Sequence, residues 1–143
     1  MKYRKATLKD TDSILELLRS TKELQGSLEV DSVYSREFAE DSILDKERNL
    51  VLVAEEEKLI GFLSAEIWQK KRFSFLADLV VIPEFRGRGI TTQLYQEYES
   101  ICKRLGIKVI NGFVQAENSL MQNFLEKRSF KRGNNFNYYE KRI

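Results

Sequence analysis

The sequence of 143 residues contains no histidine, one cysteine and one proline. The absence of histidine means that no imidazole is present to donate a proton in a reaction. Cys102 has no second cysteine to pair with, so an intrachain disulfide is excluded. With a single proline, no internal repeat and no low-complexity tract, the chain shows no sign of a linker or a second domain.

Long apolar runs and a strong excess of one charge are also missing. No run approaches the roughly 18 apolar residues of a membrane span. The basic start at 1–5 leads into polar residues and not into the apolar stretch of a secretion signal. We therefore expect a cytoplasmic protein that does not bind membranes. Lys and Arg total 24 against 22 Asp and Glu, and the net charge of +2 gives no overall bias toward nucleic acid.

Apolar residues are frequent enough to build one core. They make up 42% of the sequence, and a chain of this length can bury roughly two-thirds of its unfolded surface. We expect one domain that spans residues 1–143.

Hydrophobic periodicity predicts strands and helices in the order β-α-α-β-β-β-α-β-α-β. Ile14, Leu17 and Leu18 form an apolar stripe on the first helix, which Asp10 or Thr11 can cap. The other expected helices are 35–44, 91–105 and 118–128, and the expected strands are 2–6, 50–54, 59–68, 73–82, 107–114 and 136–139. This order indicates an α+β fold.

A turn with two glycines and two arginines lies between a buried strand and a helix. Residues 80–91 read V-V-I-P-E-F-R-G-R-G-I-T. Gly87 and Gly89 lack a β-carbon, so backbone N–H groups can close on a phosphate, and the helix that follows directs its positive dipole end to the same point. The arginines add charge and forked donors. The predicted anion site consists of Arg86, Gly87, Arg88, Gly89, Ile90 and Thr91.

Spacing separates this turn from two other nucleotide-binding motifs. The phosphate loop of NTPases has the pattern G-x-x-x-x-G-K-S/T, whereas one residue separates Gly87 from Gly89 here. The dinucleotide fingerprint requires a third glycine where this chain has Thr92.

The pattern R-x-x-G-x-T after V-V-I-P resembles the Q/R-x-x-G-x-G/A segment of the GNAT superfamily of acyl-CoA-dependent N-acetyltransferases, with Thr91 in the last position. A second segment, N-S-L-M-Q-N-F-L-E-K-R-S-F at 118–130, resembles the family's N-x-x-A-x-x-F-Y-E-K-x-G-F. Leu125 stands where many members have tyrosine, and Ser129 replaces the glycine. The two segments and the strand between them cover about residues 75–132.

This resemblance implies a central mixed, mostly antiparallel sheet with helices on both faces. It also implies acetyl-CoA as co-substrate and transfer of its acetyl group to a primary amine by direct attack in a ternary complex. In the family, the strand that here holds Leu79, Val80 and Val81 splays from its neighbour, and its backbone bonds the pantetheine arm. By the same resemblance Asn118 contacts that arm, although Asn also caps helices well, and Phe124 packs beside the arm or in the core. No residue is assigned as a metal ligand.

Two acids are candidates for the chemistry. Asp78 lies within the apolar run F-L-A-D-L-V-V, where burial raises the pKa of a carboxyl group toward values useful to a base. It is either a general base that accepts a proton from the substrate ammonium or a structural partner of a neighbouring group. Glu66 on the preceding strand is a weaker candidate. It would face Asp78 if the hairpin turns near Lys71, whereas a shift by one residue, the favoured interpretation, turns it to solvent.

Leu125 leaves the departing thiolate without the tyrosine that many family members supply. A thiol has a pKa of roughly 8.5, so protonation by a fixed side chain helps but is not required. Tyr95, Tyr98 and Cys102 follow the apolar stripe of their helix and are predicted to pack in the core. The other tyrosines considered as substitutes are Tyr138 and Tyr139.

The acceptor is expected to be a small-molecule or peptide amine, and acids near the first two helices favour a cationic one. In the family these helices and their loop wall the acceptor site. This region holds Glu29, Asp31, Glu37, Glu40, Asp41 and Asp45, although such acids are equally expected on a solvated helix face. Polyamines, aminoglycoside-like compounds, amino acids and protein-terminal amines stay open, as does a homodimer.

Two other functions compete with catalysis. Leu125 and Thr91 are compatible with a non-catalytic acyl-CoA-binding regulatory module. Basic pairs at 127–128, 131–132 and 141–142, interleaved with aromatic residues, resemble a nucleic-acid-binding surface. The near balance of charge makes nucleic-acid binding the least favoured of the three.

Overall fold

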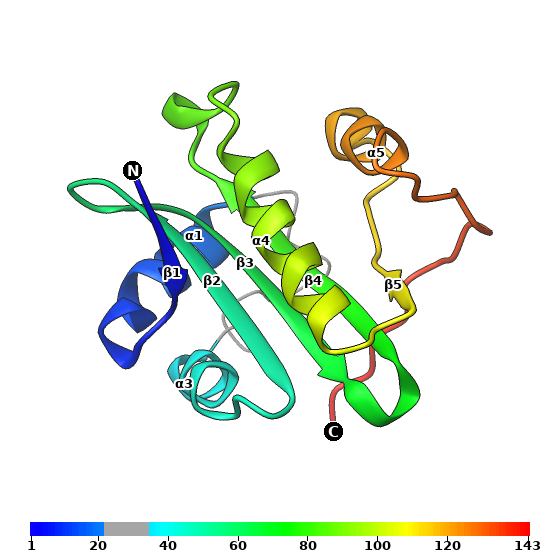
Figure 1. The fold of residues 1–143 in the computed structure, drawn as a ribbon, viewed down its shortest axis with the longest axis horizontal. Helices are drawn as coiled ribbons and strands as arrows, with labels where there is room; N and C mark the ends of the chain where they lie inside the picture. The colour runs from blue at the N-terminus through cyan, green and yellow to red at the C-terminus, as the bar shows by residue number, and fades with distance from the viewer. Residues whose placement is uncertain (22–34) are drawn as a thin grey trace.

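The computed structural model describes residues 1–21 and 35–143, which form a five-stranded sheet with the order β1-β2-β3-β4-β5 (Figure 1). The pairs β1–β2, β2–β3 and β3–β4 are antiparallel, and β5 runs parallel to β4. The strands are β1 (Lys2–Lys5), β2 (Asn49–Glu55), β3 (Leu59–Trp68), β4 (Phe73–Val81) and β5 (Val109–Asn111). The predicted α+β class with a mixed, mostly antiparallel sheet is confirmed.

Helices cover both faces of this sheet, as predicted. The described α-helices are α1 (Thr11–Ser20), α3 (Arg36–Leu44), α4 (Ile90–Arg104) and α5 (Ser119–Glu126). Three single 3₁₀ turns are η1 (Leu8–Asp10), η3 (Gln69–Lys71) and η4 (Pro83–Phe85). Ser35 caps α3, because its Oγ accepts a hydrogen bond from the N–H of Phe38 at 3.1 Å.

Successive side chains of β2 point to opposite faces of the sheet and pack in two separate parts of the core. Leu50, Leu52 and Ala54 pack in the cluster that contains the buried residues of α4. Val51 and Val53 pack with α1 and α3 on the other side, which we call the α1–α3 face. A strand buried on both faces needs apolar residues at every position, and the run L-V-L-V-A meets this requirement.

The first helix follows the pattern predicted from its sequence. It begins at Thr11, directly after Asp10, and the predicted stripe of Ile14, Leu17 and Leu18 is buried against the sheet. Side chains at this spacing share one side of a helix, so the stripe positions α1 on the sheet.

Asp10 connects the start of α1 to the sheet through a partly buried ion pair with Arg4. Its carboxylate accepts hydrogen bonds from both terminal nitrogens of Arg4 at 2.8 and 2.9 Å, and from the N–H of Thr7 at 2.7 Å. Arg4 also donates to Glu55 on β2 at 2.9 Å. The hydrogen bonds from Arg4, more than any other interaction, hold the pKa of Asp10 below its usual value.

We expect Asp10→Asn to lower the free energy of unfolding by about 2 kcal/mol at neutral pH, because hydrogen bonds to a charged group are lost. The carboxylate's contribution is present above its unfolded-state pKa and is lost as the pH falls through its lower folded-state pKa. The difference in free energy of unfolding between the parent and Asp10→Asn should therefore become smaller in acid. Urea unfolding at pH 7 and below about pH 4 measures this difference, and the exposed Glu56→Gln is the control. Equal stability of parent and Asp10→Asn at pH 7 would contradict this assignment.

The end of the sheet differs from the prediction in two respects. The strand expected at 107–114 is shorter, because β5 covers only Val109–Asn111, and its residues are exposed or half-buried. The closing strand expected at 136–139 is absent, and Phe136 and Tyr139 are 76% and 87% exposed. Aromatic residues favour strands only where they can pair and pack, and β5 offers a neighbour of just three residues.

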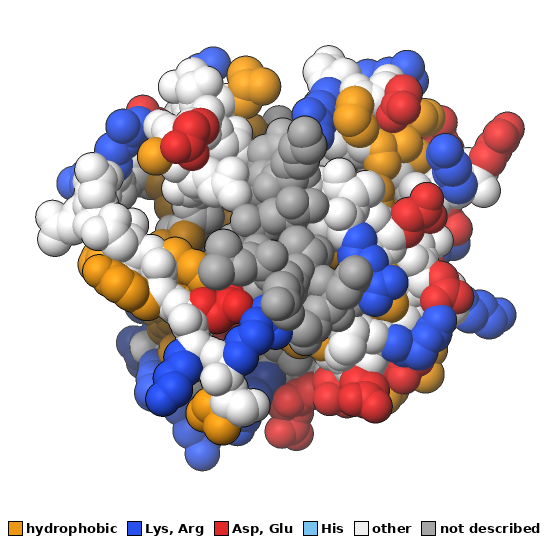
Figure 2. Space-filling view, turned by 180° about the vertical axis from the view of Figure 1, so that it is seen from behind, with side chains coloured by type: hydrophobic (Ala, Val, Ile, Leu, Met, Phe, Trp, Pro, Cys, Tyr) orange, Lys and Arg blue, Asp and Glu red, His pale blue; other side chains and the backbone are white. Residues whose placement is uncertain are grey.

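The surface shows a basic region at one end. Figure 2 shows Lys and Arg side chains gathered at its lower left, the end that carries the turn between β3 and β4. Across residues 1–21 and 35–143, no helix has the length and apolar character needed to cross a membrane.

Candidate active site

A bulge in β4 determines which way Asp78 faces. Ser64 pairs with Asp78, but the next residue of β3, Ala65, pairs with Leu76, so Ala77 is an extra residue in β4. An extra residue reverses the alternation of side chains between the two faces. Leu76 packs on the α4 side, whereas Asp78 lies on the α1–α3 face with the core residue two positions later. Nothing in our interpretation of the sequence predicted this bulge.

Beyond the bulge, β4 and β5 separate. The two strands pair only along Phe73–Phe75 of β4. Gly112, directly after β5, passes so close to β4 that a Cβ on it would lie 2.9 Å from the carbonyl oxygen of Leu76. Past this point no described strand pairs with β4 on the β5 side, so β4 has a free edge there. The splay implied by the family resemblance is therefore present.

The pairing with β3 determines which peptide groups point to this free edge. The N–H of Ile82 donates to a β3 carbonyl oxygen at 2.9 Å, and antiparallel strands alternate, so Val80 also directs its peptide groups to β3. Leu79 and Val81 direct theirs to the free edge, where the Val81 carbonyl accepts a hydrogen bond from Nε of Arg86 at 3.0 Å. Of the three residues predicted to bond the pantetheine arm, Leu79 and Val81 thus present backbone groups there and Val80 does not.

The glycine turn leads into α4 as the sequence predicted. Gly87 and Gly89 have φ values of +77° and +78°, which glycine adopts without strain. Helix α4 begins at Ile90, and the carbonyl of Gly89 accepts the N–H of Gln93 at 3.0 Å. A Cβ on either glycine would meet no atom within 4 Å. The turn is therefore open, and the first N–H groups of a 15-residue helix face outward from it.

Both arginines of the turn are exposed. Arg86 is anchored by its bond to Val81, and the guanidinium of Arg88 lies 4.7 Å from the ring centre of Phe85. Thr91 is half-buried in the first turn of α4. The positive charges thus lie beside the helix N-terminus, an arrangement that suits a phosphate or pyrophosphate.

Asp78 has a neutral hydrogen-bond partner. The hydroxyl of Ser64, opposite it on β3, donates to Oδ2 of Asp78. No described Lys or Arg forms an ion pair with this carboxylate. Burial therefore raises the pKa of Asp78, and the bond from Ser64 offsets this only in part. A carboxyl group with a raised pKa and no ion pair to a described cation is suited to accept a proton.

Glu66 does not face Asp78 across the strands. Glu66 pairs with Phe75, and Asp78 pairs with Ser64, because the hairpin register includes the bulge. Both acids nevertheless lie on the α1–α3 face, because Ser64, which pairs with Asp78, is two positions from Glu66 along β3. Glu66 is exposed, as the favoured interpretation of the sequence had it.

Helix α5 lies at the same end of the molecule as the glycine turn (Figure 1). Asn118 caps it, since its Oδ1 accepts the N–H of Met121 at 3.1 Å. Phe124 and Leu125 are half-buried against the core on the α4 side.

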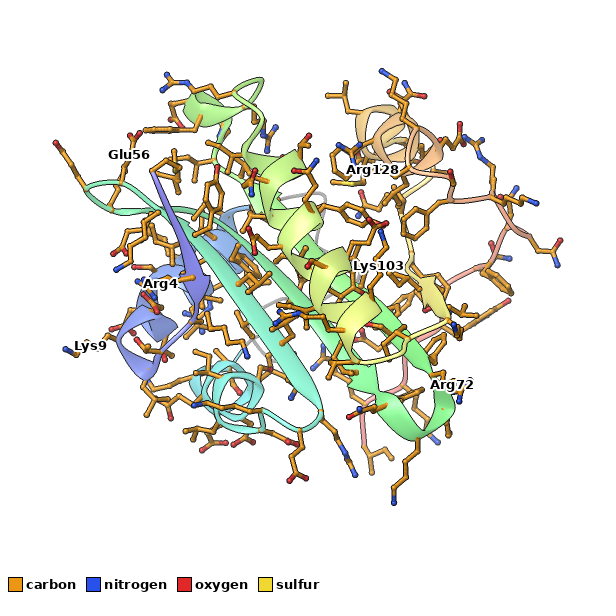
Figure 3. The ribbon with its side chains drawn as sticks, viewed as in Figure 1. Arg4, Lys9, Glu56, Arg72, Lys103 and Arg128 are labelled. Carbon is orange, nitrogen blue, oxygen red and sulfur yellow. The ribbon has the colours of Figure 1, made fainter. Side chains whose placement is uncertain are left out.

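Arg128 joins α5 to α4, a role that the sequence interpretation missed. Its guanidinium lies 3.5 Å from the ring centre of Phe124 and donates to Oγ1 of Thr92 at 2.8 Å (Figure 3). The spacing of Phe124 and Arg128, one helical turn, was the available signal. Arg132 is also engaged, with Glu126 at 2.8 Å. Two of the cations considered for nucleic-acid binding are therefore occupied within the chain.

The tyrosines of α4 belong to the core, as predicted. Tyr98 is fully buried, and its hydroxyl lies 2.6 Å from the Oγ of Ser74. The hydroxyl of Tyr95 donates to Glu99 at 3.3 Å. Burial raises the pKa of both phenols above the usual value, so neither is an effective proton donor. Cys102 is buried beside them.

The acids proposed to wall the acceptor site are only partly described. Glu29 and Asp31 lie outside the described residues. Glu37, Asp41 and Asp45 are exposed around α3, and Glu40 is paired with Arg36 at 3.3 Å. The described acids thus lie on a solvated helix face. This was the alternative to an acidic wall of the acceptor site.

The chain matches the Acetyltransferase (GNAT) family over residues 11–130, and no curated protein matches it in sequence. It is similar to the structure of PaiA N-acetyltransferase from Thermoplasma acidophilum in complex with coenzyme A, with 26% identity, 91% of this chain and 89% of that chain covered, and a TM-score of 0.81. It is also similar to aminoglycoside 6'-N-acetyltransferase AAC(6')-IG from Acinetobacter haemolyticus, with 20% identity, coverage of 100% and 99%, and a TM-score of 0.77. A third similar structure is AAC(6')-Iy in complex with the bisubstrate analogue CoA-S-monomethyl-acetylneamine, with 20% identity, coverage of 99% and 98%, and a TM-score of 0.76. The family match includes β4, the glycine turn and α5, and the chain therefore belongs to the GNAT family of acetyltransferases, which use acetyl-CoA as co-substrate.

Proposed function

We propose that this acetyltransferase moves the acetyl group from acetyl-CoA to a primary amine by direct attack of the amine on the thioester in a ternary complex. The observation that carries the proposal is the continuity of the free edge of β4. This edge leads from the glycine turn at one end to Asp78 beside the bulge at the other.

The backbone supplies most of the contacts for the co-substrate. The peptide groups of Leu79 and Val81 at the free edge hydrogen-bond the pantetheine arm as a neighbouring strand would. The N–H groups of 87–91 and the dipole of α4 hold the pyrophosphate, with Arg86 and Arg88 adding charge. Asn118 and Phe124 approach the arm from α5. Neutral backbone donors make this part of the site insensitive to pH.

Asp78 acts as the general base. An amine is protonated at neutral pH, and only its neutral form attacks the carbonyl carbon. Asp78 takes the proton, directly or through a water molecule, the nitrogen–carbon bond forms, and the carbon–sulfur bond breaks. The thiolate takes a proton from solvent or from the newly acylated nitrogen. Ser64 positions Asp78 through its hydrogen bond to Oδ2.

The acceptor approaches from the α1–α3 face, the side on which Asp78 and Glu66 both lie. Two carboxylates on one face attract a cation, so a cationic amine is favoured, as in the aminoglycoside acetyltransferases of similar fold. We propose a cytoplasmic location, where acetyl-CoA is available.

A panel of amines tests this function. CoA release is measured with a thiol reagent, with a polyamine, an aminoglycoside, an amino acid and a peptide as acceptors. We expect the polyamine or the aminoglycoside to have the highest kcat/KM. Double-reciprocal plots of initial velocity, with acetyl-CoA varied at several fixed amine concentrations, should give lines that intersect. Parallel lines would instead indicate an acetylated enzyme and contradict direct attack.

Leu125 supports one alternative, an acyl-CoA-binding module without catalysis. We expect the parent enzyme to be active without a tyrosine there, because holding amine and thioester together in a water-poor cleft supplies most of the acceleration. Leu125→Tyr should then change kcat by no more than the roughly 10²-fold of weak general-acid catalysis, with little effect on acetyl-CoA affinity. Leu125→Phe, which has the ring without the hydroxyl, is the matched control. A parent inactive with every amine, together with an active Leu125→Tyr variant, would favour the module.

A further inference from the structure

A cavity of about 990 Å³ lies at the opposite end of the sheet from the glycine turn. Residues at the end of β1, the start of β2, the end of β3 and the end of α4 line it. On β3, Gly61 pairs with Val81 near the glycine turn, and Trp68 lines the cavity. These two β3 positions are seven residues apart, which corresponds to about 23 Å along a strand. The cavity is thus separate from the proposed acetyl-CoA site.

The rim of the cavity is strongly basic. Its described lining includes six cations and a single acid, Glu47. The cations are Lys5, Lys46, Arg48, Lys70, Lys71 and Arg104. The preference of helix C-termini for cations accounts for Arg104 alone, since the other five come from the end of β1, the α3–β2 turn and η3. Figure 2 shows Lys and Arg side chains gathered at this end of the molecule.

These cations are not engaged in ion pairs within the described part of the chain. None of the six forms an ion pair with a carboxylate of residues 1–21 or 35–143. By contrast, Arg4, Arg36 and Lys103 elsewhere on the described surface are all paired. Six cations from four segments around one hollow, with Glu47 as the one acid in its described lining, create a positive potential that an anion would neutralise.

Apolar side chains and one aromatic ring also line the cavity. Ile43, Leu50 and Ile67 contribute to its lining. Trp68 is 40% exposed, and the ammonium of Lys71 lies 5.1 Å from the centre of its ring. A site with apolar walls, an aromatic surface and a cationic rim suits a ligand with a ring system and several negative charges.

We propose that this cavity binds a nucleoside polyphosphate as a second ligand, independent of acetyl-CoA. The phosphates meet the cationic rim, and the base packs against Trp68 and the apolar wall. The volume lies within the range of small-molecule sites. The cations surround one hollow and do not follow a line across the surface, which favours a compact ligand over a nucleic-acid strand, whose backbone needs an extended basic groove.

Trp68 provides a direct test, because it is the only tryptophan in the chain. ATP and inorganic tripolyphosphate are titrated into the full chain while Trp68 fluorescence is recorded, with CoA present in excess to fill the other site. We expect a saturable change with ATP and competition by tripolyphosphate. Lys46→Glu combined with Arg104→Glu should weaken ATP binding by about tenfold or more, because charge-assisted hydrogen bonds are lost.

A matched variant controls for net charge. Lys9→Glu combined with Lys58→Glu changes the charge equally at exposed positions outside the cavity lining, and Figure 3 shows Lys9 pointing away from the sheet. This variant should bind ATP within about twofold of the parent. Lys70→Glu on the exposed η3 turn repeats the test if the double variant does not fold.

Four results would overturn the proposal. The first is no saturable change in fluorescence with or without CoA, and the second is a change that occurs only when CoA is left out. The third is equal loss of ATP binding in the cavity and control variants. A single-stranded oligonucleotide that binds through the same residues when ATP does not would identify a nucleic-acid surface and likewise overturn it.

Discussion

Replacement of Gly89 by valine is expected to abolish CoA binding while the sheet and helices stay folded. The residue precedes α4 with φ at +78°, a conformation that a β-branched side chain strongly disfavours. The turn must rearrange, and its N–H groups then no longer converge on the pyrophosphate. We expect the dissociation constant for CoA to rise by about 100-fold or more, since several charge-assisted hydrogen bonds are lost. Isothermal calorimetry measures the affinity, and circular dichroism verifies the fold.

Gly106 offers a matched control at the other end of the same helix. Its φ is +74°, and a Cβ there would likewise meet no atom within 4 Å. Gly106→Val should therefore have a similar cost in stability, about 1–2 kcal/mol, with CoA affinity unchanged. If folded Gly89→Val binds CoA as tightly as Gly106→Val, the pyrophosphate site lies elsewhere.

Asp78→Asn is expected to reduce kcat by about 10²–10⁴-fold, the usual contribution of a general base. Acetyl-CoA affinity should change little, because Asp78 acts on the amine and the co-substrate is held by the backbone. Asparagine has nearly the same shape and can still accept the hydroxyl of Ser64. Steady-state kinetics with the best amine of the panel, together with calorimetry for acetyl-CoA, separates the two effects.

The pH profile provides a second criterion for Asp78. Burial raises its pKa, so the ionised base is available only above that raised value, and kcat/KM should rise with pH through it. Asp78→Asn should lose this limb of the profile. Glu66→Gln, the same chemical change at an exposed position of the same face, should retain kcat and this limb of the pH profile. Normal turnover with a large loss of thermal stability in Asp78→Asn would make Asp78 a structural residue only.

Local sequence patterns predicted most of the elements. The stripe on α1, the strands expected at 50–54 and 59–68 and the glycines before α4 each depend on residues close in sequence, and all were confirmed. The predicted closing strand was wrong because aromatic residues at 136–139 have β-propensity but find no long partner strand.

The geometry around Asp78 was not accessible from sequence. Strand β4 is apolar at most positions, since helices cover both faces of the sheet, so periodicity does not reveal where an extra residue enters. Neither glycine nor proline marks the bulge at Ala77. Because the sequence does not reveal this bulge, it left the register of Glu66 against Asp78 undetermined. A shift of one residue changes which side chains of the two strands meet.

The most direct test of the central claim is the stoichiometry of acetyl transfer by the unmodified chain. The protein is incubated with isotope-labelled acetyl-CoA and a cationic primary amine, and mass spectrometry quantifies free CoA, N-acetylated amine and acetylated protein. Our account predicts one molecule of N-acetylated amine for each CoA released, with no acetylated protein. Tight CoA binding in calorimetry without any N-acetylated product, across all amines tested, would contradict it.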